Sequence, residues 1–546
     1  MPLSASPDLV LPSEAVGPLV RGIGVLRALD AVAGRASLGE LAQTTQSTRA
    51  TVERVVATLA RMDYVRLDGR DVVLAPGAMR LPNAYLSALR LPDLLGTALE
   101  GLAADLDVTA TLAVADGVGM RLVAQAAARS RLVALSLPLG VRLPVASTAA
   151  GAVFAALWDG GQWERWRAET EKQEESGAGT ESDMERFTER VRAAAEQGWA
   201  LDDQWLEPGL VALAAPVRDR SGGPLGVVNL VGHTPRYSAA ELREKGLPRL
   251  LSATRDMDEA LLGTGLAPVP EGLGASPFEE LDEQVPAEDF LRSLARGLAV
   301  LGSFGSERAE MSLSEAAGAT GLARATTRRA LITLESLGYV EARGRRFRPT
   351  PQVLDLGCAV LSRTSLSHLA QPHLTALCER VGDSVSLAVL DGDQVRYIAR
   401  AAVTRIMSVH ITVGTRLPAF ATSLGRVLLA GLTPEARRAL LGRSAPEPRT
   451  PHTVTDPGEL AALVERAAQE GYAWVEEELE GGLRSLAVPV RDRSGMVTGA
   501  VNVAMHTSRR SVDQCRTEVL PALVDTASAI EADLHLVSRH ARVPSA

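Results

Sequence analysis

Residues 291–361 read LRSLARGLAVLGSFGSERAEMSLSEAAGATGLARATTRRALITLESLGYVEARGRRFRPTPQVLDLGCAVL, and this stretch decides the fold of the chain. Its first helix is predicted from the apolar positions Leu294, Leu298 and Leu301. A shorter helix follows from Ser312, which suits the N-cap, with Glu315 at the capping-box position. These are the first two helices of a winged helix-turn-helix.

The next helix has two different faces. It is expected to begin near Ala323, after a turn made by Gly318, Thr320 and Gly321. Its inner face recurs at helical spacing and consists of Thr327, Ala330, Leu331 and Leu334. Its outer face consists of Ala323, Arg324, Arg328 and Arg329. A helix that is apolar on one side and rich in arginine on the other is typical of a DNA-reading helix.

An arginine-rich hairpin completes the pattern. Its tip is Arg343, Gly344, Arg345 and Arg346. A reading helix in the major groove beside a basic hairpin on the phosphate backbone is a winged helix-turn-helix. The alternative is a solvated basic helix in an α/β protein.

The same pattern occurs twice in the chain. Residues 21–76 align without a gap with 296–351, at a constant offset of 275. The offset falls to 274 at Arg142 and Arg416, and to 273 where VRDRSG recurs at 490–495. Two small deletions over this span indicate duplication and fusion of a whole gene rather than an array of short repeats.

The net charge of −9 at first argues against a nucleic-acid partner. Residues 295–351 nevertheless hold nine Arg against five Glu, and residues 20–76 hold eight Arg against six acids. Phosphate binding needs a local basic face and not a basic protein, so DNA stays the expected partner.

Cysteine usage and hydropathy indicate a cytoplasmic protein. Cys358, Cys378 and Cys515 are widely spaced and odd in number, which suits the reduced thiols of a reducing compartment. The N-terminal residues show no secretion signal, and no segment approaches the roughly 18 apolar residues of a membrane span. We therefore expect no membrane contact.

The sequence contains no known motif of catalysis or cofactor binding. Gly263-Thr264-Gly265 lies in a proline-rich segment and not after a strand, and His368 and His373 are wrongly spaced for one helical face. Glu476–Glu478 is interpreted as a solvated acidic loop. We expect no catalytic residue, no cofactor and no metal, although a small-molecule enzyme remains the rival class.

These segments resemble the IclR-type bacterial transcriptional regulators, in two fused copies. The resemblance rests on residues 291–361, on TRLPAFATSLGRVLLAGL at 415–432 and on GYAWVEEELEGGLRSLAVPVRDRSG at 471–495. The second copy is most similar to the branch that governs aromatic-acid catabolism through β-ketoadipate, including 4-hydroxybenzoate and protocatechuate. The resemblance implies a DNA-binding regulator, expected to be a repressor, that such an acid controls. The alternative is a regulator of another small-acid or glycerol-type operon.

Residues 366–535 read as a sensor in their own right. Strands are predicted at Val385–Leu390, Val395–Ala399, Ile406–Val413, Leu486–Val490 and Val497–Ala504. Helices are predicted at 367–381, 421–431, 458–470 and 514–537. The fold class is therefore α+β: two tandem copies of a winged helix-turn-helix, each followed by a GAF-like effector-binding domain.

The expected domain order is a tail at 1–19, a winged helix-turn-helix at 20–78, an effector-binding domain at 79–262, a linker at 263–288, a winged helix-turn-helix at 289–351, and a linker helix near 352–362 that opens the second effector-binding domain, 352–540. About 23 linker residues span roughly 25–30 Å, comparable to the ~34 Å between DNA half-sites. The winged helices can therefore pair within one chain or in a homodimer of fused chains.

Two sets of site residues follow. The DNA-binding set is Thr48, Arg49, Glu53, Arg54 and Arg70 in the first copy, and Ala323, Arg324, Arg328, Arg329, Arg343, Arg345 and Arg346 in the second. The effector set, which the resemblance implies, is Thr422, Ser423, Leu424, Val475, Ser485, Asn502 and Ala504 in the second copy, and Thr148, Ala149, Ala150, Asp202, Ala212, Asn229 and Val231 in the first.

The effector set departs from the founding members of the family. Val475 replaces an acid and Ala504 a hydroxyl, so the second pocket is expected to be more apolar and to suit an aromatic ring. The first copy lacks the hydroxyls of Ser423 and Ser485, which predicts a different ligand or none. The alternative for each polar residue is a satisfied strand or loop group.

Overall fold

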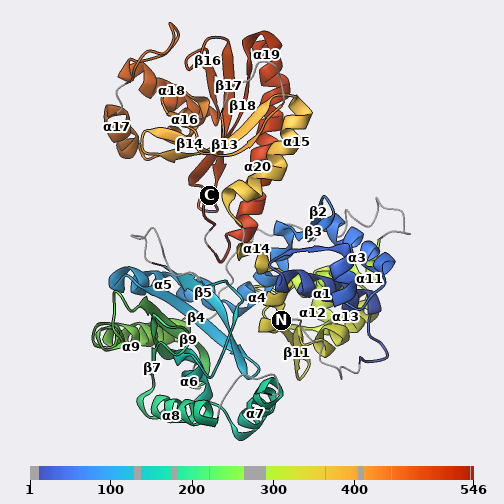
Figure 1. Ribbon diagram of the computed structural model, residues 1–546. Helices are drawn as coiled ribbons and strands as arrows, with labels where there is room; N and C mark the ends of the chain where they lie inside the picture. Colours follow the sequence, from blue (N-terminus) through green and yellow to red (C-terminus); the bar gives the residue numbers. More distant parts are fainter. Residues whose placement is uncertain are drawn as a thin grey trace. The chain divides into compact units, whose positions relative to one another are not determined.

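The computed structural model describes residues 11–127, 137–174, 181–219, 222–263, 290–362, 364–403, 411–443, 446–541 and 543–545 (Figure 1). The chain forms two compact units, 1–362 and 363–546. The first unit contains both winged helices and the first sensor, and the second unit contains the second sensor. The predicted interdomain linker lies, from residue 264 onward, outside the described residues.

The first winged helix consists of α1 (Gly17–Ala31), β1 (Arg35–Ser37), α2 (Leu38–Thr44), α3 (Arg49–Arg61), β2 (Val65–Asp68) and β3 (Asp71–Leu74). Its strands pair in the order β1-β3-β2. Helix α1 carries Pro18 in its first turn, where the missing N–H of proline removes no intrahelical hydrogen bond.

The second winged helix consists of α11 (Arg292–Gly302), β10 (Met311–Ser312), α12 (Leu313–Thr320), α13 (Arg324–Ser336), β11 (Val340–Arg343) and β12 (Arg346–Pro349). The predicted capping box is confirmed: Ser312 and Glu315 satisfy each other's backbone N–H groups. The predicted turn was wrong by a few residues. Gly318 and Thr320 lie inside α12, and the chain turns at Gly321, whose φ of 66° favours glycine.

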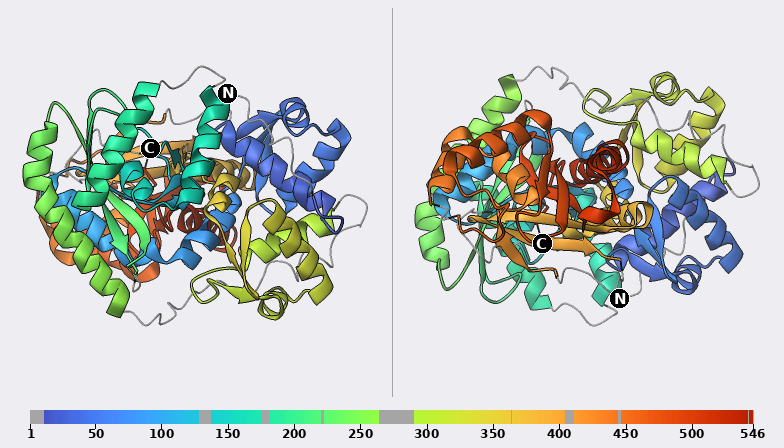
Figure 2. Two further views of the ribbon diagram at one scale, coloured as in Figure 1. Left: turned by 90° about the horizontal axis from the view of Figure 1, so that it is seen from below. Right: turned by 90° about the horizontal axis from the view of Figure 1, so that it is seen from above.

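The two winged helices pack against each other, and α1–α3 and α11–α13 lie side by side in every view (Figure 2). Helices α1 and α11 approach so closely that neither has room for a side chain at its central glycine. A Cβ on Gly22 would run into Leu294, and a Cβ on Gly297 would run into Leu19. These two contacts are equivalent in the repeat, since both residue pairs are related by the offset of 275.

Hydrogen bonds across this junction are reciprocal as well. The backbone N–H of Val16 donates to Thr333 Oγ1 at 3.0 Å, and the N–H of Leu291 donates to Thr58 Oγ1 at 3.0 Å. Each threonine lies on the reading helix of one copy and caps the first helix of the other. An approximate twofold axis therefore relates the two winged helices of a single chain.

Each winged helix is followed by a short linker. The first linker is η1 (Pro76–Met79) and α4 (Arg80–Leu89), and the second is η2 (Pro351–Leu356) and α14 (Ala359–Ser362). The continuous linker helix expected near 352–362 was wrong, because a 3-10 helix and a single α-helical turn are separated at Gly357. A Cβ at Gly357 would come within 2.6 Å of the Ala78 carbonyl oxygen, so the crossing of the two linkers leaves no room for a side chain there.

The first sensor consists of α5 (Leu91–Leu106), β4 (Thr109–Asp116), β5 (Gly119–Ala126), β6 (Arg142–Leu143), α6 (Ala149–Ala155), α7 (Gly160–Glu174), α8 (Glu181–Gln197), β7 (Ala200–Asp203), β8 (Leu210–Arg218), β9 (Pro224–His233) and α9 (Ala239–Gly263). Its antiparallel sheet has the order β6-β5-β4-β9-β8-β7. Helices α5 and α9 pack on one face of the sheet, and α6, covered by α8, packs on the other.

The second sensor repeats this arrangement with α15 (Leu366–Val381), β13 (Ser384–Asp391), β14 (Gln394–Ala401), β15 (Arg416–Pro418), α16 (Ser423–Ala430), α17 (Pro434–Arg443), α18 (Pro457–Glu470), β16 (Ala473–Glu476), β17 (Leu483–Arg491), β18 (Val497–His506), α19 (Val512–Gln514) and α20 (Leu520–Val537). The sheet order is β15-β14-β13-β18-β17-β16, with α15 and α20 on one face and α16 on the other (Figure 1). The α+β class and the tandem repeat are confirmed.

Two details of the second sensor differ from the sequence prediction. Residues 411–413 of the strand predicted at Ile406–Val413 are a loop and turn, and residues 406–410 lie outside the described residues. The long helix predicted at 514–537 contains a π-helical turn at Cys515–Val519, before α20. Cys358, Cys378 and Cys515 are all buried free thiols, as expected.

Valines at both central glycines should loosen the winged-helix pair. The double substitution Gly22→Val and Gly297→Val is expected to cost about 1–3 kcal/mol through overpacking, and so to lower the midpoint temperature of unfolding of the first unit. Differential scanning calorimetry measures this midpoint. The matched control is Gly96→Val with Gly101→Val in α5, where an added Cβ meets nothing within 4 Å. Equal midpoints for the two double variants would contradict the close packing.

Candidate DNA interface and effector site

Helix α13 has the two faces that the sequence predicted. Thr327, Ala330, Leu331 and Leu334 are buried, and Arg324, Arg328 and Arg329 are exposed. The exposed arginines lie on the first two turns of the helix, where a reading helix contacts base edges.

The chain segment before α1 reaches this arginine face. The Glu14 carboxylate pairs with Arg328, and the Glu14 carbonyl oxygen accepts a hydrogen bond from Arg329 Nε at 3.3 Å. The side chains of both Glu14 and Arg328 are about half exposed. An exposed ion pair contributes only about 0–1 kcal/mol, so a DNA phosphate can replace the carboxylate. Nothing in the local sequence pattern indicated this contact, because the two residues are far apart in the chain.

Two of the arginines predicted in the second wing contact other residues of the same winged helix. Arg343 pairs with Glu341 at 3.1 Å, and Arg346 donates to the Glu310 carbonyl at 2.8 Å. Arg345, at the turn of the hairpin, is exposed. The wing is therefore held by short-range polar contacts and keeps its tip accessible to solvent.

The first copy carries a less basic version of the same surface. Thr48 caps α3 by accepting from the Thr51 N–H at 3.3 Å, and Arg49 pairs with Glu53 at 2.9 Å. Arg54 and the wing residue Arg70 are exposed. Because Glu53 neutralises Arg49 on the reading face, the first copy offers less positive potential to DNA than the second.

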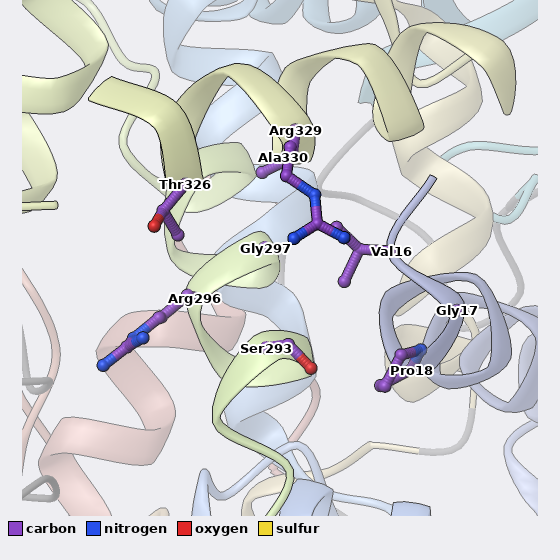
Figure 3. A pocket seen from close by; sticks show the side chains of 9 residues that line it. All are labelled: Val16, Gly17, Pro18, Ser293, Arg296, Gly297, Thr326, Arg329 and Ala330. Atoms are coloured by element: carbon purple, nitrogen blue, oxygen red, sulfur yellow. The ribbon is translucent and has the colours of Figure 1, made fainter. Parts of the chain in front are cut away.

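A crevice of about 340 Å³ lies where the start of α1 meets α11 and α13 (Figure 3). Its polar lining comes from Ser293, Arg296, Thr326 and Arg329. Arg329 extends from α13 toward Val16, on the side where the two winged helices join. The crevice lies beside the arginine face of α13. Its lining residues Arg296 and Arg329 extend the basic surface to the junction of the two winged helices.

The second sensor brings its predicted effector residues together in one row across the sheet. Val475 on β16 is the register partner of Ser485 on β17, and Ser485 is the partner of Ala504 on β18. Asn502 lies two residues from Ala504 and therefore on the same face. This face is covered by α16, because Ser423 Oγ lies 2.7 Å from Ser485 Oγ.

The start of α16 closes over this row. Thr422 caps the helix by accepting from the Gly425 N–H at 3.0 Å, and Ser423 and Leu424 are fully buried. Asn502 is 4% exposed, and among the described residues its Oδ1 atom has no hydrogen-bond donor. A buried unpaired carbonyl costs about 1–3 kcal/mol, so the position favours a donor supplied by a ligand.

A buried ion pair beside this row was missed at the level of sequence. Arg426 Nη2 lies 2.5 Å from Glu478 Oε2, and the two residues are 2% and 7% exposed. The interpretation of residues 476–478 as a solvated loop was wrong for Glu478, because Arg426 draws the carboxylate inward. Arg426 also donates to the Phe420 carbonyl at 3.2 Å, so the pair fixes the acidic loop to α16.

The first sensor has the same row with different chemistry. Asp202, Ala212 and Val231 are register partners across β7, β8 and β9, and Thr148 caps α6 as Thr422 caps α16. Ala149 and Ala150 are buried at the start of α6 and provide no hydroxyl. The Nδ2 group of Asn229 donates to Thr111 Oγ1 at 3.2 Å.

The buried ion pair of the second sensor is absent from the first, because Ala152 and Trp205 stand at the positions equivalent to Arg426 and Glu478. Asp202 is 3% exposed and accepts from the Trp205 N–H at 2.7 Å. Burial raises the pKa of Asp202 to about 6. The two sensors therefore share a framework and differ in the charge and polarity of the row.

Asp202→Asn is expected to stabilise the first sensor near pH 8 and to have little effect near pH 4.5. Because burial raises the pKa of Asp202 from 3.8 to about 6, folding favours the protonated carboxyl. Stability rises as the pH falls through about 6, and above it the buried charge costs about 2–3 kcal/mol. Thermal unfolding at both pH values measures this, with the exposed neighbour Asp203→Asn as the control. A shift of equal size at both pH values would refute the assignment.

Comparison with known proteins identifies both halves of this architecture. The IclR helix-turn-helix domain matches residues 18–69 and 293–344. The bacterial transcriptional regulator IclR C-terminal domain matches residues 83–259 and 358–532. No helix among the described residues is long and apolar enough to cross a membrane.

Two regulators of known role are similar to about half of this chain each. The Pca regulon regulatory protein of Pseudomonas putida is 41% identical over 251 residues, which cover 46% of this chain and 86% of that protein. The p-hydroxybenzoate hydroxylase transcriptional activator of Acinetobacter baylyi is 34% identical over 253 residues, 45% of this chain and 93% of that protein.

Among solved structures, the inducer-binding domain of an Acinetobacter PobR double mutant in complex with 3-hydroxybenzoic acid is 31% identical, with a TM-score of 0.29. The matched region covers 30% of this chain and 97% of the solved PobR domain. The family matches extend over both copies and most of the chain, and they describe transcriptional regulators and not enzymes. The chain belongs to the IclR family of bacterial transcriptional regulators, with the helix-turn-helix and the C-terminal domain each present twice.

Proposed function

We propose that this protein regulates an aromatic-acid catabolic operon, and that a small aromatic carboxylate such as 4-hydroxybenzoate or protocatechuate releases it from operator DNA. The observation that carries the proposal is the buried row of Val475, Ser485 and Ala504 under the start of α16. The two similar regulators, of a Pca regulon and of p-hydroxybenzoate hydroxylase, support the same class of operon.

The chemistry of the row suits such an acid. The first N–H groups of α16, at Ser423 and Leu424, point away from the helix and can receive a carboxylate. Val475 and Ala504 offer apolar surface to an aromatic ring. Asn502 Oδ1, which is buried without a donor among the described residues, can then accept a hydrogen bond from a phenolic hydroxyl of the ligand.

Operator binding is assigned to both reading helices. Arg324, Arg328 and Arg329 of α13 would contact one half-site, and Arg49, Glu53 and Arg54 of α3 would contact the other. Since the two sets differ, the half-sites should differ in sequence. The winged helices already pair within one chain, so we propose that one chain occupies one operator in the cytoplasm without first forming a homodimer.

Isothermal titration calorimetry with 4-hydroxybenzoate should detect one site per chain, in the second sensor. Asn502→Ala is expected to weaken binding about tenfold or more, because it removes a buried acceptor of the ligand hydroxyl. The matched control is Asn229→Ala at the equivalent position of the first sensor, which should leave the affinity within about twofold. Equal losses for the two variants would contradict the assignment to the second sensor.

The second copy should dominate operator affinity. Glu53 and Asp71 stand in the first copy where the second has Arg328 and Arg346, and an acid repels the phosphate backbone. Arg328→Glu with Arg346→Asp should therefore weaken binding more than Arg49→Ala with Arg70→Ala. Gel shifts at fixed salt give the ranking, and the reverse order would refute the unequal contribution.

A further inference from the structure

The first sensor is bound by a buried arginine to the linker of the other copy. Arg121 on β5 is 6% exposed, and its guanidinium contacts Asp355 on η2 through two hydrogen bonds, at 2.5 and 2.8 Å. The same guanidinium lies 2.5 Å from Asp116 and donates to the Gly140 carbonyl at 3.1 Å. A bidentate arginine–carboxylate contact fixes both distance and angle. It therefore sets the orientation of η2 against the first sensor.

The rest of this second linker is held from two sides. The Ala359 N–H at the start of α14 donates to Asp30 Oδ1, on α1, at 2.8 Å. A Cβ on Gly140 of the first sensor would come within 3.0 Å of both Leu354 and Cys358. The linker η2–α14 is thus wedged between the first winged helix and the first sensor, immediately before the chain continues into the second sensor.

The residues at the equivalent positions of the repeat cannot form the same polar contacts. Arg396 is the equivalent of Arg121, but the equivalent of Asp355 is Arg80, and two guanidinium groups repel each other. The equivalent of Asp30 is Gly305, which has no side-chain acceptor. Arg396 lies instead 3.4 Å from Asp391 on its own sheet, and Arg80 donates to the Met62 carbonyl at 3.0 Å.

We propose that Arg121 and Asp355 are positioning residues that clamp the second linker, and that this clamp transmits an effector-induced movement of the second sensor to the winged-helix pair. The inference rests on the proposed function. The chain leaves the second winged helix through η2–α14 and has no other covalent route to the second sensor. When the linker is stiff, a movement of the second sensor displaces the winged-helix pair in a defined direction. When the linker is loose, the linker itself deforms and the movement does not reach the DNA-binding surface.

The test compares Asp355→Asn with the matched control Arg396→Met. Asp355→Asn keeps the size of the side chain and removes its charge, whereas Arg396→Met removes the equivalent arginine on the side without a clamp. Operator affinity is measured by fluorescence anisotropy with and without 4-hydroxybenzoate. The ratio of the two affinities in the wild type defines the coupling factor.

In Asp355→Asn the coupling factor is expected to fall at least fivefold. Operator affinity without the acid, and acid affinity without DNA, should stay within about twofold of the wild type. Because coupling is reciprocal, the factor by which operator DNA changes the affinity for the acid should fall by the same amount. The proposal would be overturned if the coupling factor stayed unchanged in Asp355→Asn, or if Arg396→Met lowered it equally. If Asp355 had a merely structural role, Asp355→Asn would change the midpoint temperature of unfolding and leave the coupling factor unchanged.

Hydrogen exchange of residues 351–362 tests the clamp without an effector. Asp355→Asn should accelerate exchange in this segment, and Arg396→Met should not. Arg121→Lys, which keeps the charge and loses the bidentate geometry, gives the same comparison if Asp355→Asn does not fold. A wild type that shows no response to the acid contradicts the proposed function. Unchanged exchange in both clamp variants contradicts the clamp itself.

Discussion

The close approach of α1 and α11 is the constraint on which the DNA-binding half of the molecule depends. Gly22 and Gly297 let each helix receive a leucine of the other, and Thr58 and Thr333 satisfy the N–H groups at the opposite helix starts. Both contacts need residues of two winged helices at once. The reading helices α3 and α13 are therefore fixed relative to each other before any DNA is present, and the ordering entropy of a dimer does not have to be overcome again at the operator.

Pairing inside one chain also explains how the copies could diverge. In a dimer of identical chains, any substitution appears on both sides of the axis. Here the exposed face of the reading helix carries Arg328 in one copy and Glu53 in the other. Asp355 contacts Arg121 on one side, and Arg80 stands at the equivalent position on the other. A homodimer would form such a salt bridge on both sides of the axis or on neither, whereas the fused chain carries it on one side alone. Asymmetry in the operator contacts and in the linkers follows from the fusion.

The sequence predicted those features that depend on neighbours along the chain. Periodicity placed the buried face of α13, and the Ser312–Glu315 capping box marked the start of α12. The row of Val475, Ser485 and Ala504 came from family resemblance, and the strand register brings these residues together. Contacts between distant segments left no periodic signal, so the Glu14–Arg328 pair and the break at Gly357 were not foreseen. Glu478 was misjudged for the same reason, since its partner Arg426 lies on another element.

The two sensors treat buried charge in opposite ways, and this difference bears on what each can bind. In the second sensor, Arg426 and Glu478 neutralise each other beside the row, and the row itself carries the Ser485 hydroxyl and the Asn502 amide. A ligand carboxylate bound at the row, as proposed, would therefore meet no uncompensated charge of the protein. In the first sensor, the carboxyl of Asp202 lies within the row, and its pKa is raised to about 6 because burial disfavours the charge. A ligand that donates a hydrogen bond or carries a positive charge would relieve this cost, so the same framework favours a different chemistry in each copy.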